Sequence, residues 1–250
     1  MAEADETIVG IHSVSEALAG GESVKRIAIA QHRQADPALK EIVEDAKRRG
    51  VAIKIEPESF FKRFGNVRHQ HVAATVAAFE PADWAALRRR IVDKKDALIV
   101  VADHIEDPQN LGAIMRAAES AGAHGLVIPE RRAAGVTAAT RRAAAGAASH
   151  LPVAVVPNLV RALEDLKADG HWVSGLSNRP EARPYTQADF KGKCTLVVGS
   201  EGKGLSRLVS ERCDFLVSIP MLGKVASLNA AAATAVVLYE VLRQRSAAGL

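Results

Sequence analysis

The sequence is poor in cysteine and in aromatic residues, and it has no long apolar run. Only Cys194 and Cys213 occur among 250 residues, and they form no CxxC unit, so neither a disulfide framework nor a zinc site is indicated. Two Trp and two Tyr leave little surface for base stacking, which disfavours a general binder of single-stranded nucleic acid. The longest stretch without Asp, Glu, Lys, Arg or His, Val225 to Tyr239, is too short to span a membrane.

The N-terminus is acidic and lacks the basic and apolar regions of a signal peptide, so we expect a cytoplasmic protein. The net charge is only +4, but the basic residues are clustered. The clusters are Lys47 to Arg49, Lys62-Arg63, Arg88 to Arg90, Arg131-Arg132 and Arg141-Arg142. Such clusters could neutralise the phosphates of a nucleic acid or could be solvated helix faces, and the sequence leaves both interpretations open.

Residues 1–79 predict a small α/β unit. We expect strands at 7–11, 24–30, 51–55 and 72–79, and helices at 13–18, 36–49 and 57–64. Glu80 to Asp83 is short, polar and contains proline, as is typical of a linker, and a basic helix is expected from Trp84 to Lys94. We therefore divide the chain into an N-terminal unit (1–79), a linker with a basic helix (80–95) and a larger domain (96–250).

Strands and helices alternate in the larger domain. The expected strands are 97–102, 125–128, 153–156, 171–174, 195–198 and 215–219, and the expected helices are 111–121, 137–145, 159–168, 205–210 and 228–243. Ala97 to Ala102 is continuously apolar, as expected of a strand covered on both faces. The alternation predicts an α/β fold with a mostly parallel sheet covered by helices, which binds ligands beyond the C-terminal ends of its strands.

Three loops after predicted strands combine polar residues with glycine or proline. The loop from Asp103 to Gly112 contains Asn110 near a helix start, where it could act as a cap. Arg116 lies six residues further on the same helix, and we expect it to face the same cleft unless it is a plain surface charge. The loop from Gly199 to Gly204 is rich in glycine but matches neither GxGxxG nor GxxxxGK[ST], so a dinucleotide or P-loop site is rejected.

The third loop, Ile219 to Asn229, joins an apolar strand to an alanine-rich helix that has almost no charge before Glu240. Ser227 or Asn229 can cap that helix. The helix must be buried, either in the core or against another subunit. Its N-terminus could hold a ligand with backbone amides, although an ordinary strand–turn–helix corner has the same pattern.

In this order the three loops resemble the motifs of the SpoU-type RNA 2′-O-ribose methyltransferases of the SPOUT class. The motifs are N-L-G-A-I-M-R from Asn110, G-S-E-G-K-G-L from Gly199 and I-P-M-L-G-K-V-A-S-L-N-A from Ile219. The segments G-I-H-S-V-S-E-A-L from Gly10 and R-H-Q-H-V-A-A from Arg68 look like the RNA-binding domain of that family.

With R-R-A-A-A-G-A-A-S-H-L-P-V from Arg141, the chain is most similar to the branch that methylates a guanosine ribose in bacterial 23S rRNA. It departs from that branch at His71, where glycine is expected.

The resemblance implies a parallel α/β sheet with a C-terminal trefoil knot that binds S-adenosylmethionine. Gly199, Ile219 and Leu228 would line the cofactor pocket, with Met221 and Leu222 nearby. The chain would form a homodimer through the knot and the final helix, act on RNA, and need no metal because the sulfonium donor is already activated.

The resemblance also implies a catalytic set, whose members are Asn110, Arg116, Glu201, Ser227 and Asn229. The family assigns Arg116 a part in removing the proton, but a guanidinium holds its proton far above neutral pH. We therefore expect Arg116 to orient the hydroxyl and clamp an RNA phosphate, and Glu201 to position Arg116 or the RNA. Ser227 and Asn229 would fix the substrate and the helix start.

Three alternatives remain. The first is a tRNA 2′-O-methyltransferase, and the second is a catalytically silent RNA-binding or ribosome assembly protein of the same fold. The third, a nicotinamide-dependent oxidoreductase, is disfavoured because no glycine fingerprint follows Val101.

Overall fold

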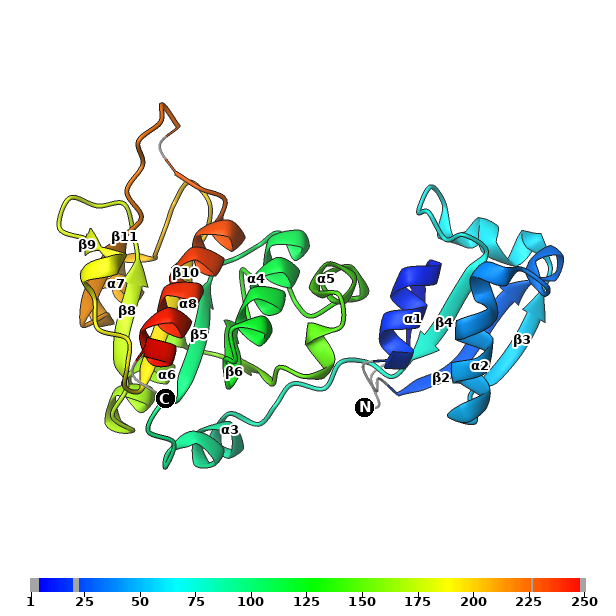
Figure 1. The fold of residues 1–250 in the computed structure, drawn as a ribbon, viewed down its shortest axis with the longest axis horizontal. Coiled ribbons are helices and arrows are strands. Elements are labelled where there is room, and N and C mark those ends of the chain that lie inside the picture. The colour runs from blue at the N-terminus through cyan, green and yellow to red at the C-terminus, as the bar shows by residue number, and fades with distance from the viewer. Residues whose placement is uncertain (1–4, 20–22, 226, 248–250) are drawn as a thin grey trace. The chain divides into compact units, whose positions relative to one another are not determined.

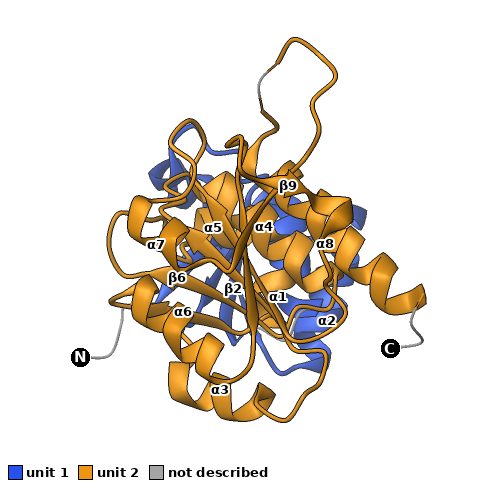
Figure 2. Cartoon of the chain, turned by 90° about the vertical axis from the view of Figure 1, so that its left-hand side faces the viewer, with its two compact units in different colours: residues 1–80 blue, residues 81–250 orange. Residues whose placement is uncertain are grey.

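A computed structural model describes residues 5–19, 23–225 and 227–247, and Figure 1 shows its elements. The chain divides into two compact units, Met1–Glu80 and Pro81–Leu250, which Figure 2 distinguishes by colour. No helix within the described ranges is long and apolar enough to cross a bilayer.

The first unit has a four-stranded sheet in the order β1-β4-β2-β3. Its elements are β1 (Glu6–Val9), α1 (Ile11–Ala19), β2 (Val24–Ala30), α2 (Lys40–Arg48), β3 (Ala52–Glu56) and β4 (Val72–Val76). Strand β4 is antiparallel to both neighbours, whereas β2 and β3 are parallel. Asp36 caps the turn that begins at Pro37, where its side chain accepts a hydrogen bond from the amide of Ala38 at 2.9 Å.

His71, which stands where glycine is expected, has a backbone conformation that is typical of glycine. Its φ of 56° lies in the left-handed region, which glycine adopts at no steric cost. The neighbouring Gln70 shares this conformation with a φ of 49°. Position 71 therefore has a backbone conformation that favours glycine, although the residue is histidine.

The second unit is built on a seven-stranded parallel sheet in the order β7-β6-β5-β10-β8-β11-β9. The strands are β5 (Leu98–Asp103), β6 (Gly125–Pro129), β7 (Val153–Val156), β8 (Trp172–Leu176), β9 (Arg183–Pro184), β10 (Cys194–Gly199) and β11 (Phe215–Ser218). The predicted parallel α/β fold is therefore confirmed. All six residues of β5 are buried, as its continuous apolar pattern predicts.

Helices cover both faces of this sheet (Figures 1 and 2). They are α3 (Trp84–Ile91), α4 (Pro108–Ser120), α5 (Ala138–Ala144), α6 (Leu159–Ala168), α7 (Arg207–Arg212) and α8 (Ala230–Ala247). Leu87 and Ile91 of α3 pack into the same core cluster as residues of α6, α7 and the strands. On the other face α4 packs between α5 and α8.

The basic helix predicted between the domains belongs to the second unit. Arg88 of α3 forms an ion pair with Asp169, in which Nε donates at 2.7 Å, and the indole nitrogen of Trp84 donates to Asp165 at 3.0 Å. These acidic partners raise the pKa of Arg88 further above its usual range. Of the basic clusters, the one at Arg88 is thus partly committed to holding α3 in place, which leaves it less free to bind phosphate.

Candidate active site

The carboxyl ends of β5, β8, β10 and β11 lie at one edge of the sheet because these strands are parallel. The predicted polar loops follow these ends. Helix α4 begins after β5, and its cap is Asp107, which accepts hydrogen bonds from the amides of Gln109 and Asn110 at 3.1 and 3.2 Å. The suggestion that Asn110 caps this helix is therefore wrong, and the side chain of Asn110 is left for other contacts.

Asn110, Glu201 and Asn229 form a closed hydrogen-bonded triangle. Nδ2 of Asn110 donates to Oε1 of Glu201 at 3.0 Å. Nδ2 of Asn229 donates to the same Oε1 at 2.5 Å and to Oδ1 of Asn110 at 2.7 Å. Residues 91 and 119 positions away from Asn110 in the sequence thus meet in one network.

The start of α8 is tied to this triangle. Oδ1 of Asn229 accepts hydrogen bonds from the amides of Ala231 and Ala232 at 2.9 and 3.2 Å, so Asn229 is the N-cap. The amide of Ala230 points to Oε1 of Glu201 at 3.4 Å. The carboxylate therefore sits where the helix dipole and unpaired amides favour negative charge.

Arg116 does not join this network. Its side chain is exposed on α4 and makes no hydrogen bond or ion pair with any residue that the structure describes. The expectation that it faces the same direction as Asn110 is wrong. At about 100° per residue, a side chain six residues further along an α-helix points about 120° away from the first. Glu201 does not contact Arg116 within one chain either.

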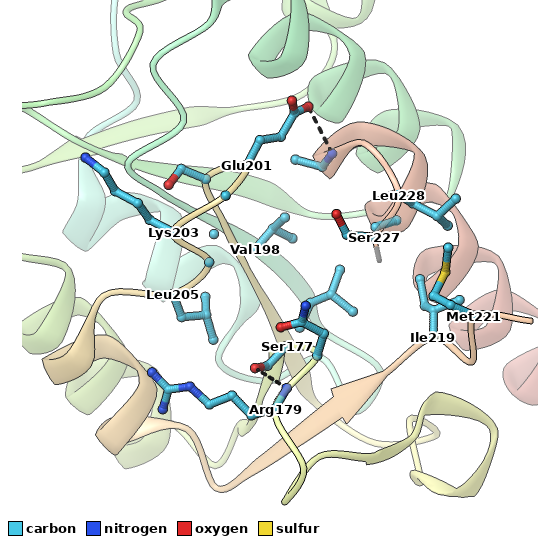
Figure 3. A pocket seen from close by; sticks show the side chains of 18 residues that line it. Ser177, Arg179, Val198, Glu201, Lys203, Leu205, Ile219, Met221, Ser227 and Leu228 are labelled. Atoms are coloured by element: carbon cyan, nitrogen blue, oxygen red, sulfur yellow. Dashed lines mark hydrogen bonds between the residues drawn. The ribbon is translucent and has the colours of Figure 1, made fainter. Parts of the chain in front are cut away.

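A cavity of about 380 Å³ opens beside the triangle, at the ends of β8, β10 and β11. Gly199, Ile219, Met221 and Leu228 line it, together with Glu201 and Ser227. Figure 3 shows Ile219, Met221 and Leu228 along one side, with Val198 and Leu205 across from them. Leu222 does not line the cavity, contrary to expectation: its side chain is 100% exposed, because the loop turns outward after Met221.

The shape of this cavity depends on Gly199. An added Cβ there would lie 2.2 Å from the carbonyl carbon of Gly204, because the loop folds back over the strand end. The amide of Gly204 donates to the carbonyl of Ser200 at 2.9 Å and closes this turn. The result is a glycine-lined cradle between apolar walls that suit an adenine ring, with Ser177 and Asn178 available for polar groups. The residues present therefore fit S-adenosylmethionine.

Sequence patterns missed several residues of this region. A second cavity of about 210 Å³ shares Ser200, Glu201 and Lys203 with the first and is also lined by His104 and Asn110. The buried Asp103 contacts His104 there, Nδ1 to Oδ1 at 2.5 Å. The sequence signal that could have indicated these residues is a pair of polar residues directly after a buried strand.

Comparisons with known proteins cover both units. The model of the "SpoU rRNA Methylase family" matches residues 97–239, and that of "RNA 2'-O ribose methyltransferase substrate binding" matches residues 7–82. A Bacillus subtilis (strain 168) protein, YacO, which its name assigns to the TrmH family of tRNA/rRNA methyltransferases, is 39% identical over 250 residues, which is 100% of both chains.

Solved structures agree. The SpoU methyltransferase AviRb from Streptomyces viridochromogenes, crystallised with the cofactor AdoMet, has a TM-score of 0.78 at 27% identity, covering 97% of this chain and 91% of its own. A TrmH/SpoU tRNA modifying enzyme of A. aeolicus has a TM-score of 0.57 at 30% identity, covering 66% of this chain and 84% of its own. The chain thus belongs to the SpoU rRNA methylase family: it has the α/β SPOUT fold with an N-terminal substrate-binding domain, and it methylates ribose 2′-hydroxyls of RNA with S-adenosylmethionine as donor.

Proposed function

We propose that this protein methylates the 2′-hydroxyl of a guanosine in 23S rRNA. The observation that carries the proposal is the triangle of Asn110, Glu201 and Asn229 at the mouth of the cofactor cavity, which shares Glu201 with it. Three sequence motifs that are far apart supply one site. The 23S guanosine target rests on the similarity of the Arg141 to Val153 segment and of the N-terminal unit to that branch.

S-adenosylmethionine supplies a methyl group on a sulfonium, which is an activated electrophile. The protein must therefore align a ribose hydroxyl with the cofactor cavity and handle one proton. We assign Gly199, Ile219, Met221 and Leu228 to the cofactor, mainly through shape and backbone groups. Ser227 lies in the same cavity and is assigned to positioning the ribose.

Glu201 holds Asn110 and Asn229 in a fixed arrangement, because an ionised carboxylate only accepts hydrogen bonds and both amides donate to it. Asn229 uses both of its Nδ2 hydrogens and both lone pairs of Oδ1 within this network. Asn110 donates only one Nδ2 hydrogen to Glu201, so its second hydrogen is the one preorganised for an RNA backbone. Arg116, exposed and without a partner in the described residues, is assigned to clamping an RNA phosphate, for which its planar guanidinium suits bidentate contacts.

We also propose a homodimer through the C-terminal segment. Helix α8 buries one face against its own unit but leaves an apolar stripe outside. Ala232, Val236, Tyr239 and Leu242 lie on that stripe at helical spacing, with Tyr239 52% and Leu242 39% exposed. Two copies could bury these stripes against each other. Sedimentation at micromolar concentration tests this, and a monomer would refute it.

The test of function uses labelled S-adenosylmethionine with rRNA and, separately, tRNA from cells that lack this protein. Alkali cleaves RNA only where the 2′-hydroxyl is free, so a 2′-O-methylated site survives as a labelled dinucleotide. The proposal predicts label in 23S rRNA, in a dinucleotide that begins with guanosine. Label in tRNA alone, or beside another base, would refute the target. Cofactor binding without transfer to either RNA would favour the catalytically silent alternative.

A further inference from the structure

Asp103 and His104, which precede the motif that begins at Asn110, form a dyad beside the triangle. Asp103 is fully buried at the end of β5, and its Oδ2 accepts a hydrogen bond from the amide of Ser206 at 2.6 Å. Its Oδ1 lies 2.5 Å from Nδ1 of His104. Because an ionised carboxylate can only accept, Nδ1 carries the proton of the neutral imidazole, and Nε2 is left as a base.

The backbone of His104 holds the ring in place by an unusual conformation. Its φ of 56° lies in the left-handed region, which is uncommon for residues other than glycine, although asparagine, aspartate and histidine adopt it more often than the rest. Backbone conformations of this kind gather at functional sites, and an observed outlier is a reason to look for a role.

His104 shares the smaller cavity with Asn110, Glu201 and Lys203. Glu201 and Lys203 also line the cofactor cavity, so the cavity that holds the imidazole adjoins the cofactor cavity. About a third of the His104 side chain, 36%, is exposed, and Nε2 has no partner among the described residues. A hydroxyl of bound RNA can therefore reach it.

We propose that Nε2 of His104 is the base that takes the proton of the ribose 2′-hydroxyl. The inference rests on the methyl transfer described above, but not on which RNA or base receives the methyl group. The 2′-oxygen bonds to the methyl carbon while the carbon–sulfur bond breaks and leaves its electron pair on sulfur. The hydroxyl proton passes to Nε2, the imidazolium is stabilised by the Asp103 carboxylate, and the proton then leaves to solvent.

Several charged groups face this ring. Glu106 and Asp107 come from its own loop, and Glu201 and Lys203 come from the loop after β10. Asp103 is the group in direct contact with the ring, so its carboxylate is the one that would pair with the imidazolium formed in the reaction. Arg116, the other candidate for proton removal, keeps its proton at neutral pH and lines neither cavity.

His104→Asn is the decisive variant. Asparagine tolerates a positive φ and can offer its amide N–H to Asp103, but it has no basic nitrogen in place of Nε2. The matched control is His150→Asn, which removes an exposed imidazole of the same unit that lines neither cavity. Thermal unfolding and S-adenosylmethionine affinity of both variants should match those of the unchanged protein.

The measured quantity is the single-turnover rate constant of methyl transfer. The substrate is total RNA from cells that lack the protein, because this RNA contains every rRNA and tRNA target. The unchanged protein and His150→Asn should show a rate that falls with unit slope at low pH. His104→Asn should be slower by roughly 10²–10⁴-fold and should lose that slope. A rate within tenfold of the control, with the slope kept, would overturn the proposal, whichever nucleotide is labelled.

A second readout does not depend on activity. Nitrogen-15 spectra of the imidazoles, with His104 assigned from the His104→Asn variant, should show its proton on Nδ1 and a free Nε2 at neutral pH. A proton on Nε2, or a ring that stays doubly protonated up to pH 8, would also overturn the proposal.

Discussion

Replacing Gly199 with alanine tests whether the loop after β10 shapes the cofactor cavity. The added Cβ would lie 2.2 Å from the carbonyl carbon of Gly204, 2.3 Å from its oxygen and 2.4 Å from the amide nitrogen of Leu205. Ordinary van der Waals contact begins near 3.4 Å, so this backbone must retreat by about 1 Å. No flexible side chain is available to absorb the clash, because all three atoms belong to the backbone.

Overpacking of this kind costs about 1–3 kcal/mol of stability. The displaced loop also carries Glu201, which anchors Asn110 and Asn229. We therefore expect Gly199→Ala to lower the free energy of unfolding by that amount and to weaken S-adenosylmethionine binding at least tenfold, which is about 1.4 kcal/mol. Urea unfolding and isothermal titration calorimetry measure the two effects.

Gly192→Ala is the matched control. A Cβ at Gly192 would meet nothing within 4 Å, and this glycine lines neither cavity. Its stability should change by no more than about 0.5 kcal/mol, with unchanged cofactor affinity. If Gly199→Ala bound the cofactor as tightly as this control, the cradle would not be what holds the cofactor.

Three further predictions concern single residues. Arg116→Lys should slow single-turnover transfer by about 10–100-fold with unchanged cofactor affinity, because lysine cannot make the bidentate contact; near-normal turnover would refute the phosphate clamp. Asn229→Ala should lose about 1 kcal/mol of stability in urea unfolding, because the cap of α8 is removed. Asn229→Ser should recover that stability but not the transfer rate, because serine is too short to replace the hydrogen bond to Glu201. Full recovery of the rate would mean that Asn229 is only a cap. Burial lowers the pKa of His171 from 6.5 to about 4, so the unfolded chain binds the proton first: stability should be complete above pH 6.5 and fall as the pH drops towards 4, whereas His171→Gln should flatten that dependence in urea midpoints.

Much of the fold could be predicted because its periodic signals are strong. Strands Val24–Ala30 and Val153–Val156 and helix Leu159–Ala168 have the predicted bounds. The two-residue strand Arg183–Pro184 was missed because two residues carry no periodicity. The order in which the strands lie in the sheet leaves no trace in periodicity and comes from the structure alone. The SPOUT fold itself was expected only from the resemblance.

The site shows where local pattern fails. The prediction that Asn110 caps α4 was wrong because Asp107, three residues earlier, is the cap. Both residue types favour cap positions, and the sequence pattern does not show which of the two caps the helix. The prediction that Leu222 lies at the cofactor cavity was wrong because its loop is exposed, and no packing directs the side chain inward. His104 escaped notice because its partner Asp103 matters only through burial, and its backbone conformation is invisible in the sequence.

The acceptor atom is tested most directly with two RNAs that differ at a single atom. Once the labelled nucleotide is known, one RNA fragment containing it is made with ribose and another with 2′-deoxyribose at that nucleotide only. The account predicts that the first accepts labelled methyl groups and the second accepts none, while both bind the protein equally. Equal labelling of the deoxy fragment would place the methyl group on the base and contradict ribose methylation by this site.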